Sequence, residues 1–115
     1  MKTTIFMLLN ALPQWLSLDR AARRAFHAQS LAPILNAHPQ TRLRYYDAEA
    51  FSGRCSDIAV FETENLLDYS DLIEDLRDTA FFGAPYYQVV DIIPAIEEGY
   101  LDYDARMAAE PATAT

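Results

Sequence analysis

Hydrophobic positions along the chain follow two patterns, one typical of strands and one typical of helices. Apolar runs or alternations predict four strands, at residues 3–10, 41–47, 55–62 and 86–93. The first run is apolar on both of its faces, as in a central strand that is covered on both sides. Pro94 is expected to end the last strand, because proline cannot donate a ladder hydrogen bond.

Between these strands the apolar residues recur at helical spacing. Asp19 is a suitable N-cap for a helix over residues 20–37, in which Pro33 should produce a kink or begin a new turn. Thr63 or Asn65 can cap a second helix. Its buried stripe, at i, i+3, i+4 and i+7, consists of Tyr69, Leu72, Ile73 and Leu76. Residues 95–103 are expected to form a short helix or an arm.

The resulting order, β-α-β-β-α-β, predicts an α+β fold of the ferredoxin-like type. In this fold a four-stranded antiparallel sheet carries both helices on one face. We expect a single domain over residues 1–105 and a disordered tail over residues 106–115.

Two helices on one face leave the other face of the sheet uncovered, and that face carries large apolar side chains. An exposed apolar patch of this kind usually marks an interaction site. The simplest cover is a second copy of the same sheet, related by a two-fold axis. The sequence therefore predicts a homodimer of the dimeric α+β-barrel type.

Composition and charge narrow the class of partner. The 115 residues are 51% apolar and carry a net charge of −8, which argues against nucleic acid and against anionic membrane as partners. The charge is also uneven along the chain. Residues 1–56 hold seven Lys/Arg and three Asp/Glu, whereas residues 57–115 hold two and fourteen. This division favours packing of one half against the other, or against a second copy.

The single cysteine, Cys55, allows no internal disulfide, which is in keeping with a reducing cytoplasm. We interpret it as a small buried hydrophobe. The apolar start of the chain imitates a signal peptide, but Asn10 and Pro13 interrupt it early. The preferred interpretation is a first strand of a cytoplasmic protein, with a signal peptide as the lesser alternative.

Candidate site residues gather around the second strand. Arg44, Tyr46 and Asp57 are expected to converge near one end of the sheet, where two donors and a carboxylate can hold a small acidic or phenolic ligand. The alternative is structural: the arginine and the aspartate pair across the strands, and the tyrosine packs at a subunit boundary.

Other candidates are His27 on the first helix, and Trp15 and Tyr87 as aromatic walls of a pocket. Each also has a structural interpretation, and His38 suits a helix C-terminus as a cation. The two histidines have no Cys or carboxylate at ligand spacing, so no metal site is predicted. No phosphate-binding loop or nucleophile motif is present either, and no cofactor is expected.

Several stretches resemble a known family of small bacterial proteins. They are FMLLNALPQWLSL, QSLAPILNAHP, YYDAEAFSGRCSDIAVFET, LIEDLRDTAFF and VVDIIPAIEEGY, and the most specific part is DAEAFSGR followed by SD. Over residues 3–103 the chain resembles the darcynin family. The resemblance implies a ferredoxin-like α+β fold, with no assigned activity and no catalytic residues to transfer.

Three functions remain open at this point. The first is a small homodimeric ligand-binding or regulatory module without turnover. The second is a cofactor-independent dimeric α+β-barrel enzyme, similar to a monooxygenase or an isomerase, acting on a small apolar or phenolic metabolite. The third is a purely structural interaction protein whose aromatic surfaces serve only dimerisation.

Overall fold

The computed structural model describes residues 1–109 of the chain. In chain order its elements are β1 (Thr3–Ala11), α1 (Pro13–Leu16), α2 (Arg20–Phe26), the π-helical turn η1 (His27–Leu31), α3 (Ala32–Ala37), β2 (Thr41–Asp47), β3 (Asp57–Thr63), α4 (Leu66–Arg77), α5 (Ala80–Gly83), β4 (Tyr87–Ala95) and α6 (Gly99–Ala109).

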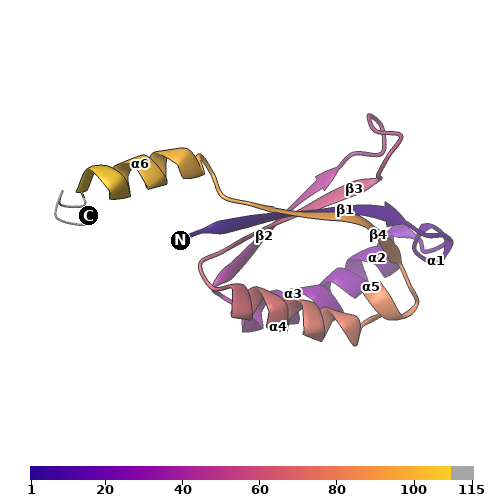
Figure 1. Ribbon diagram of the computed structural model, residues 1–115. Coiled ribbons are helices and arrows are strands. Elements are labelled where there is room, and N and C mark those ends of the chain that lie inside the picture. The colour runs from indigo at the N-terminus through magenta and orange to yellow at the C-terminus, as the bar shows by residue number, and fades with distance from the viewer. Residues whose placement is uncertain (110–115) are drawn as a thin grey trace.

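The four strands form one antiparallel sheet in the order β2-β3-β1-β4. Helices α2 to α5 lie against one face of this sheet, and the opposite face carries no helix over it (Figure 1). The predicted ferredoxin-like α+β fold is therefore confirmed. The apolar first run, β1, occupies a central position between β3 and β4.

The core lies between the sheet and the helices. Ile5, Met7 and Leu9 of β1 are almost fully buried, and they meet Phe61 of β3 and Leu72 of α4. Complete burial of such a side chain stabilises the fold by roughly 1.5–3 kcal/mol. The alternation along β1 sends these three residues to the helix side and Phe6 and Leu8 to the other side.

The helix caps follow the sequence prediction. The Asp19 carboxylate accepts a hydrogen bond from the backbone N–H of Ala22 at 2.8 Å. At α4 the cap is Asn65, whose side-chain oxygen accepts from the N–H groups of Leu67 and Asp68. Thr63, two residues earlier, supports this cap, because its hydroxyl accepts a hydrogen bond from the N–H of Asn65.

The first long helix is not continuous. Its middle turn, η1, is π-helical, and α3 begins at Ala32 with Pro33 in its first turn. The predicted new turn at the proline is thus present, and the π-turn directly precedes it. A π-turn widens the helix and is frequent at functional sites.

The end of the last strand differs from the prediction. β4 continues through Pro94 to Ala95, and Pro94 is paired in register with Ile5 of β1. The expectation that Pro94 ends the strand was wrong, because β4 is an edge strand. An edge strand can leave the proline nitrogen on its unpaired side.

The arm after β4 is a helix, α6, and it runs through Ala109. The disordered tail was therefore placed too early, since residues 106–109 are helical; residues 110–115 lie outside the described part. In Figure 1, α6 stands away from the body, beyond the end of the sheet.

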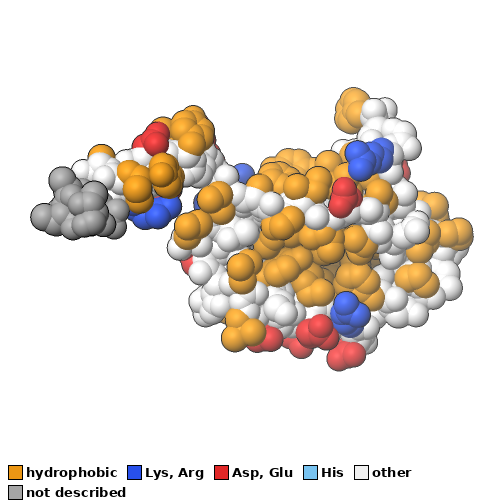
Figure 2. Space-filling view, viewed as in Figure 1, with side chains coloured by type: hydrophobic (Ala, Val, Ile, Leu, Met, Phe, Trp, Pro, Cys, Tyr) orange, Lys and Arg blue, Asp and Glu red, His pale blue; other side chains and the backbone are white. Residues whose placement is uncertain are grey.

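The sheet face opposite the helices, here called the open face, is apolar at its centre. Phe6 is 38% exposed and Ile93 is 46% exposed there, and they pair across β1 and β4. Tyr46, Ile58 and Val60 continue the same surface on β2 and β3. In Figure 2 hydrophobic side chains also cover the front of the body and parts of α6. No described helix is long and apolar enough to cross a membrane.

Candidate functional site

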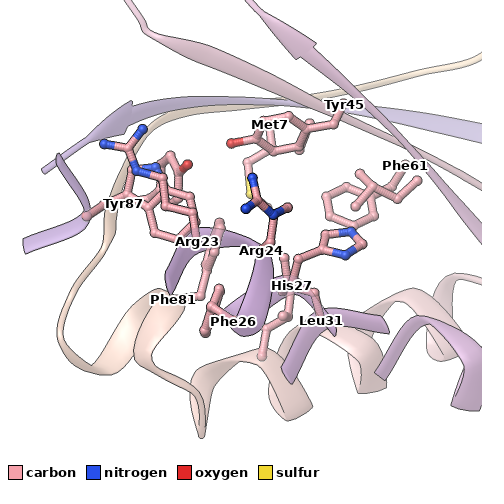
Figure 3. Close-up of a pocket in the computed structure, with 14 residues that line it drawn as sticks. Met7, Arg23, Arg24, Phe26, His27, Leu31, Tyr45, Phe61, Phe81 and Tyr87 are labelled. Atoms are coloured by element: carbon pink, nitrogen blue, oxygen red, sulfur yellow. The ribbon is translucent and has the colours of Figure 1, made fainter. Parts of the chain in front are cut away.

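A partly enclosed cavity of about 290 Å³ lies between the sheet and the helices (Figure 3). Its walls are almost entirely apolar and aromatic, with two arginines and two tyrosines among them. The lining residues are Met7, Trp15, Arg23, Arg24, Phe26, His27, Leu31, Leu43, Tyr45, Ala59, Phe61, Leu76, Phe81 and Tyr87.

Aromatic rings build the wall nearest to α1 and β4. The ring centroid of Trp15 lies 5.8 Å from that of Phe26 and 5.3 Å from that of Tyr87. Phe81 stacks on Tyr87 at 4.9 Å. Aromatic pairs at these separations stabilise one another beyond simple burial, so this wall is preorganised. The structure thus brings together Trp15 and Tyr87, the two residues predicted as pocket walls.

Arg23 places a half-buried cationic group beside this wall. Its guanidinium carbon is 5.6 Å from the centroid of the Trp15 ring, and one Nη donates to the carbonyl of Leu16 at 3.1 Å. Its Nε is buried and has no hydrogen-bond partner among the described residues. An unpaired buried donor costs about 1–3 kcal/mol, and an acceptor on a ligand would satisfy it.

Two phenols lie at the sheet side of the cavity. Figure 3 shows the hydroxyl groups of Tyr45 and Tyr87 directed toward each other. Burial raises the pKa of Tyr45 above its ordinary value, and the Tyr87 hydroxyl raises it further. Burial likewise raises the pKa of Tyr87. Both phenols are therefore neutral at neutral pH and can act as hydrogen-bond donors.

His27 begins the π-turn and reaches the cavity from its exposed rim. It lines the cavity together with Leu31, four residues further on, and Figure 3 shows its ring extending toward Phe61. The π-turn thus carries two lining residues. His27 is exposed, so it is accessible to a ligand that enters from solvent.

The predicted trio Arg44, Tyr46 and Asp57 does not converge, and this expectation was wrong. Arg44 and Tyr46 face the open side of the sheet. Asp57 is paired in register with Asp47, one position beyond Tyr46, and therefore points to the helix side.

The structural alternative for these residues also needs correction. Arg44 lies near Glu62 at 4.0 Å and not near Asp57. The Asp57 carboxylate instead accepts from the Ser56 hydroxyl at 2.7 Å. Burial raises the pKa of Asp57, with Asp47 adding to the effect.

Sequence reasoning missed Arg23 and Tyr45 as lining residues. Arg23 lies three residues before Phe26 and shares part of that face of the helix, so helical spacing contained this signal. Tyr45 alternates with Leu43 on the helix side of β2. The period-two alternation contained this signal.

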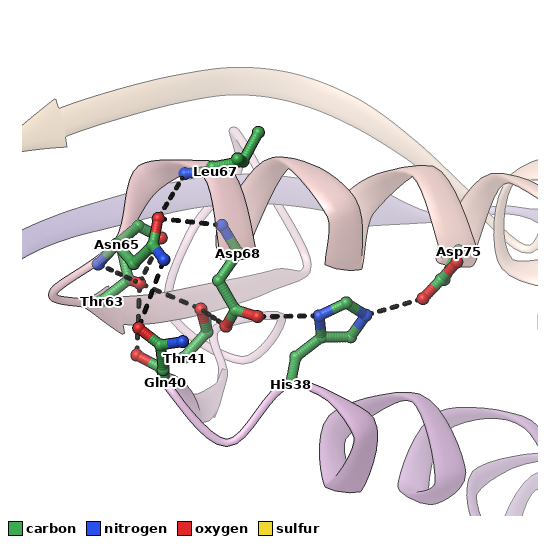
Figure 4. Close-up of polar contacts among 8 residues, drawn as sticks. All are labelled: His38, Gln40, Thr41, Thr63, Asn65, Leu67, Asp68 and Asp75. Carbon is green, nitrogen blue, oxygen red and sulfur yellow. Dashed lines mark hydrogen bonds and ion pairs between the residues drawn. The ribbon is translucent and has the colours of Figure 1, made fainter.

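The most strongly hydrogen-bonded histidine lies elsewhere. His38 caps α3 and places its Nδ1 3.0 Å from Asp68 and its Nε2 2.6 Å from Asp75 (Figure 4). Asp68 also accepts from the Thr41 hydroxyl at 2.8 Å. This cluster joins α3, α4 and β2, and we interpret it as structural. Residues 1–109 contain no group of three or more His, Cys, Asp or Glu arranged to hold a metal ion.

Comparisons with known proteins show the family of this chain. A family model described as "Darcynin, domain of unknown function" matches residues 1–115. The chain belongs to the darcynin family. "Darcynin 1" of Acinetobacter baumannii is 49% identical over 90 residues, covering 78% of this chain and 100% of the relative. "Darcynin" of Chromobacterium violaceum is 51% identical over 78 residues, covering 68% of this chain and 99% of the relative.

Among solved structures, the darcynin chain resembles chlorite dismutase from Candidatus Nitrospira defluvii. A W146Y R173Q mutant of that enzyme superimposes with a TM-score of 0.69 at 9% identity, covering 97% of this chain and 50% of the other. The complex with imidazole also gives 0.69, at 11% identity, covering 97% of this chain and 44% of the other. This chain thus spans about half of the enzyme's length. At such identities the likeness shows the fold alone.

Proposed function

We propose that this darcynin is a homodimeric binding module for a small ligand with an apolar body and an anionic head group. The cavity between the sheet and the helices is the binding site. The observation that carries the proposal is the unpartnered, buried Nε of Arg23 at an otherwise apolar cavity. An acceptor on the ligand would remove the cost of this lone donor.

The cavity supports a ligand of limited size. Its volume of about 290 Å³ is at the lower end for small-molecule pockets. In another protein, an apolar cavity of roughly 150 Å³ already binds benzene. A single ring or short alkyl chain that carries one substituent therefore fits the available space.

The polar groups favour an anionic acceptor over a cationic or neutral head group. Arg23 and Arg24 both line the cavity, and the neutral phenols of Tyr45 and Tyr87 can donate hydrogen bonds beside them. Charge-assisted hydrogen bonds from arginine to a carboxylate are about twice as strong as neutral ones. A carboxylate or a phenolate is thus the expected head group.

Binding is favoured over turnover by the protonation states of the groups in the cavity. The raised pKa values of both tyrosines make them poor general bases near neutral pH. His27 is the remaining acid-base candidate, and it lies on the exposed rim. A cofactor-independent enzyme would therefore have to use His27 as its acid or base. In that case a bound ligand would be slowly converted to a product.

A melting series tests the proposal. Cyclohexanecarboxylate at 100 times its dissociation constant should stabilise the protein by about 2.7 kcal/mol, whereas cyclohexanecarboxamide should have a much smaller effect. Arg23→Gln should weaken carboxylate binding about tenfold or more, which corresponds to about 1.4 kcal/mol. Arg20→Gln, an exposed arginine on the same helix, is the matched control. Equal responses to the acid and the amide would contradict the proposal.

The homodimer is proposed on a separate observation, the apolar open face. Phe6, Ile93 and Tyr46 are each exposed by more than a third there. A second copy that packs its own open face on this surface would bury all three in both subunits. The cavity lies on the opposite side of the sheet, so the dimer leaves its entrance accessible.

A further inference from the structure

α6 presents an apolar stripe that no other helix or strand covers (Figure 1), although the Arg106 guanidinium of the same helix lies 6.0 Å from the centroid of the Tyr103 ring. Tyr100, Tyr103 and Met107 recur at i, i+3 and i+7, and they are exposed by 63%, 55% and 42%. An isolated helix of 11 residues is marginal in water. Since α6 stands away from the body (Figure 1), the stripe is available to a second molecule.

One acidic residue lies within this stripe. Asp104 is four residues after Tyr100 and three before Met107, so it is on the same side of the helix. It makes no ion pair within residues 1–109, whereas Asp102, on the other side, pairs with Arg106 at 3.0 Å. A surface that covers the stripe would therefore need a cation opposite Asp104.

The open face offers such a cation at a defined place. In the strand register Arg42 lies opposite Glu62, Glu62 lies opposite Thr4, and Thr4 lies opposite Ala95. These four residues form one row across the sheet, with Arg42 and Ala95 at its two ends. Arg42 is exposed and has no ion pair in the described part of the chain. α6 begins four residues after Ala95.

Charge selects between the two ways of stacking the open faces. A two-fold axis along the strands places β4 of one copy over β2 of the other, and Ala95 over Arg42. A two-fold axis across the strands places β2 over β2 and β4 over β4. Residues 87–109 hold five acidic residues and one arginine, whereas the open side of β2 carries Arg42 and also Arg44, which lies 4.0 Å from Glu62. The first arrangement therefore joins opposite charges.

We infer that α6 is an exchanged arm: in the homodimer proposed above, each α6 packs its apolar stripe on the second copy beside β2, and Asp104 pairs with Arg42 of that copy. The contact occurs twice by symmetry. It accounts for the helix, its exposed stripe and the acidic residue within it. The acidic second half of the chain then neutralises the basic first half of the other copy.

Charge reversal in trans tests the arm. Arg42→Glu and Asp104→Arg should each raise the dimer dissociation constant about tenfold, since each reversal breaks two contacts in the homodimer. An equimolar mixture of the two variants should recover a wild-type-like heterodimer, because both contacts are then complementary. Sedimentation velocity gives the dissociation constants, and native mass spectrometry identifies the heterodimer.

The mixture separates an exchanged arm from an arm folded on its own sheet. An arm folded on its own sheet would be rescued in the Arg42→Glu/Asp104→Arg double variant but not in the mixture, and that result would overturn the inference. Arg20→Glu and Asp71→Arg, on the helix layer, form the matched control pair and should leave dissociation unchanged. If the wild type is a dimer and neither charge reversal changes its dissociation constant, the exchanged arm is refuted but the homodimer is not. If the wild type is a monomer, the homodimer itself is refuted.

Discussion

Protonation of His38 should stabilise the fold in a restricted range of pH. Both ring nitrogens contact carboxylates, Asp68 at 3.0 Å and Asp75 at 2.6 Å, and only the doubly protonated ring can donate to both. Hydrogen bonds to Asp75 and then Asp68 raise the pKa of His38. His38 and then Thr41 lower the pKa of Asp68.

The directions of the two pKa shifts define the pH range in which this cluster stabilises the fold. Because the folded-state pKa of His38 is raised, its stabilisation is complete below the unfolded-state pKa of about 6.5 and is lost as the pH rises through the folded-state pKa. The Asp68 contribution is present above an unfolded-state pKa of about 3.9 and is lost as the pH falls through the lowered folded-state pKa. Both are therefore complete between about pH 4 and pH 6.5.

The size of the effect follows from burial. The His38 side chain is 11% exposed, so its ring is largely shielded from water, but the Asp75 side chain is 54% exposed and solvent screens its share. Charge-assisted hydrogen bonds stabilise by about 1.5–3 kcal/mol when buried, and exposed pairs by about 0–1. We expect His38→Gln to lower the free energy of unfolding by about 1–2 kcal/mol inside the window.

Urea unfolding followed by circular dichroism, from about pH 5 to about pH 9, measures the difference in unfolding free energy between wild type and His38→Gln. The difference should be largest between about pH 5 and 6 and should shrink above neutral pH. His27→Gln removes the other histidine of the chain and is the control. A difference that is as large above neutral pH as it is between about pH 5 and 6 would refute the reasoning.

Two further predictions concern the cavity and the open face. Ala59→Leu, at a buried lining position, should fill part of the cavity and abolish ligand-induced stabilisation in melting assays while leaving the fold intact; unchanged ligand response would contradict this. Ile93→Asp should convert the dimer to monomer in sedimentation velocity, because Ile93 lies on the open face. Ile92→Asp is the control and should leave the dimer intact, since Ile92 is equally exposed, at 46%, but faces the other side of the sheet. Dissociation caused by Ile92→Asp but not by Ile93→Asp would contradict a dimer interface on the open face.

The fold could be predicted because apolar periodicity fixes which face of each element is buried. The alternation of Ile5, Met7 and Leu9 placed β1, and the stripe around Leu72 placed α4. Pro94 was misjudged because its effect depends on whether the strand has a second neighbour, and the order of strands is a tertiary property. The extent of α6 was not predicted either, because within residues 1–109 no sheet or helix packs on it to impose a buried face.

The site was harder to predict because it depends on strand register. Tyr46 and Asp57 were expected to lie together on neighbouring strands. In the observed register Tyr46 is opposite Ile58 and Asp57 is opposite Asp47, so the two side chains are on opposite faces of the sheet. Trp15, Tyr87 and His27, which aromatic character and helix position had suggested, all line one cavity. The His38 cluster joins residues 30 and 37 positions apart, a pairing that neither local spacing nor composition reveals.

Trp15 allows the most direct measurement of ligand binding. It is the single tryptophan of the chain and it lines the cavity, so its emission reports on an occupied site. Cyclohexanecarboxylate does not absorb in the near ultraviolet and can be titrated without an inner-filter correction. The proposed function predicts a saturable change in Trp15 emission at one ligand per chain, which Arg23→Gln weakens and Arg20→Gln does not. Emission that does not change, or that drifts linearly without saturation, would contradict it.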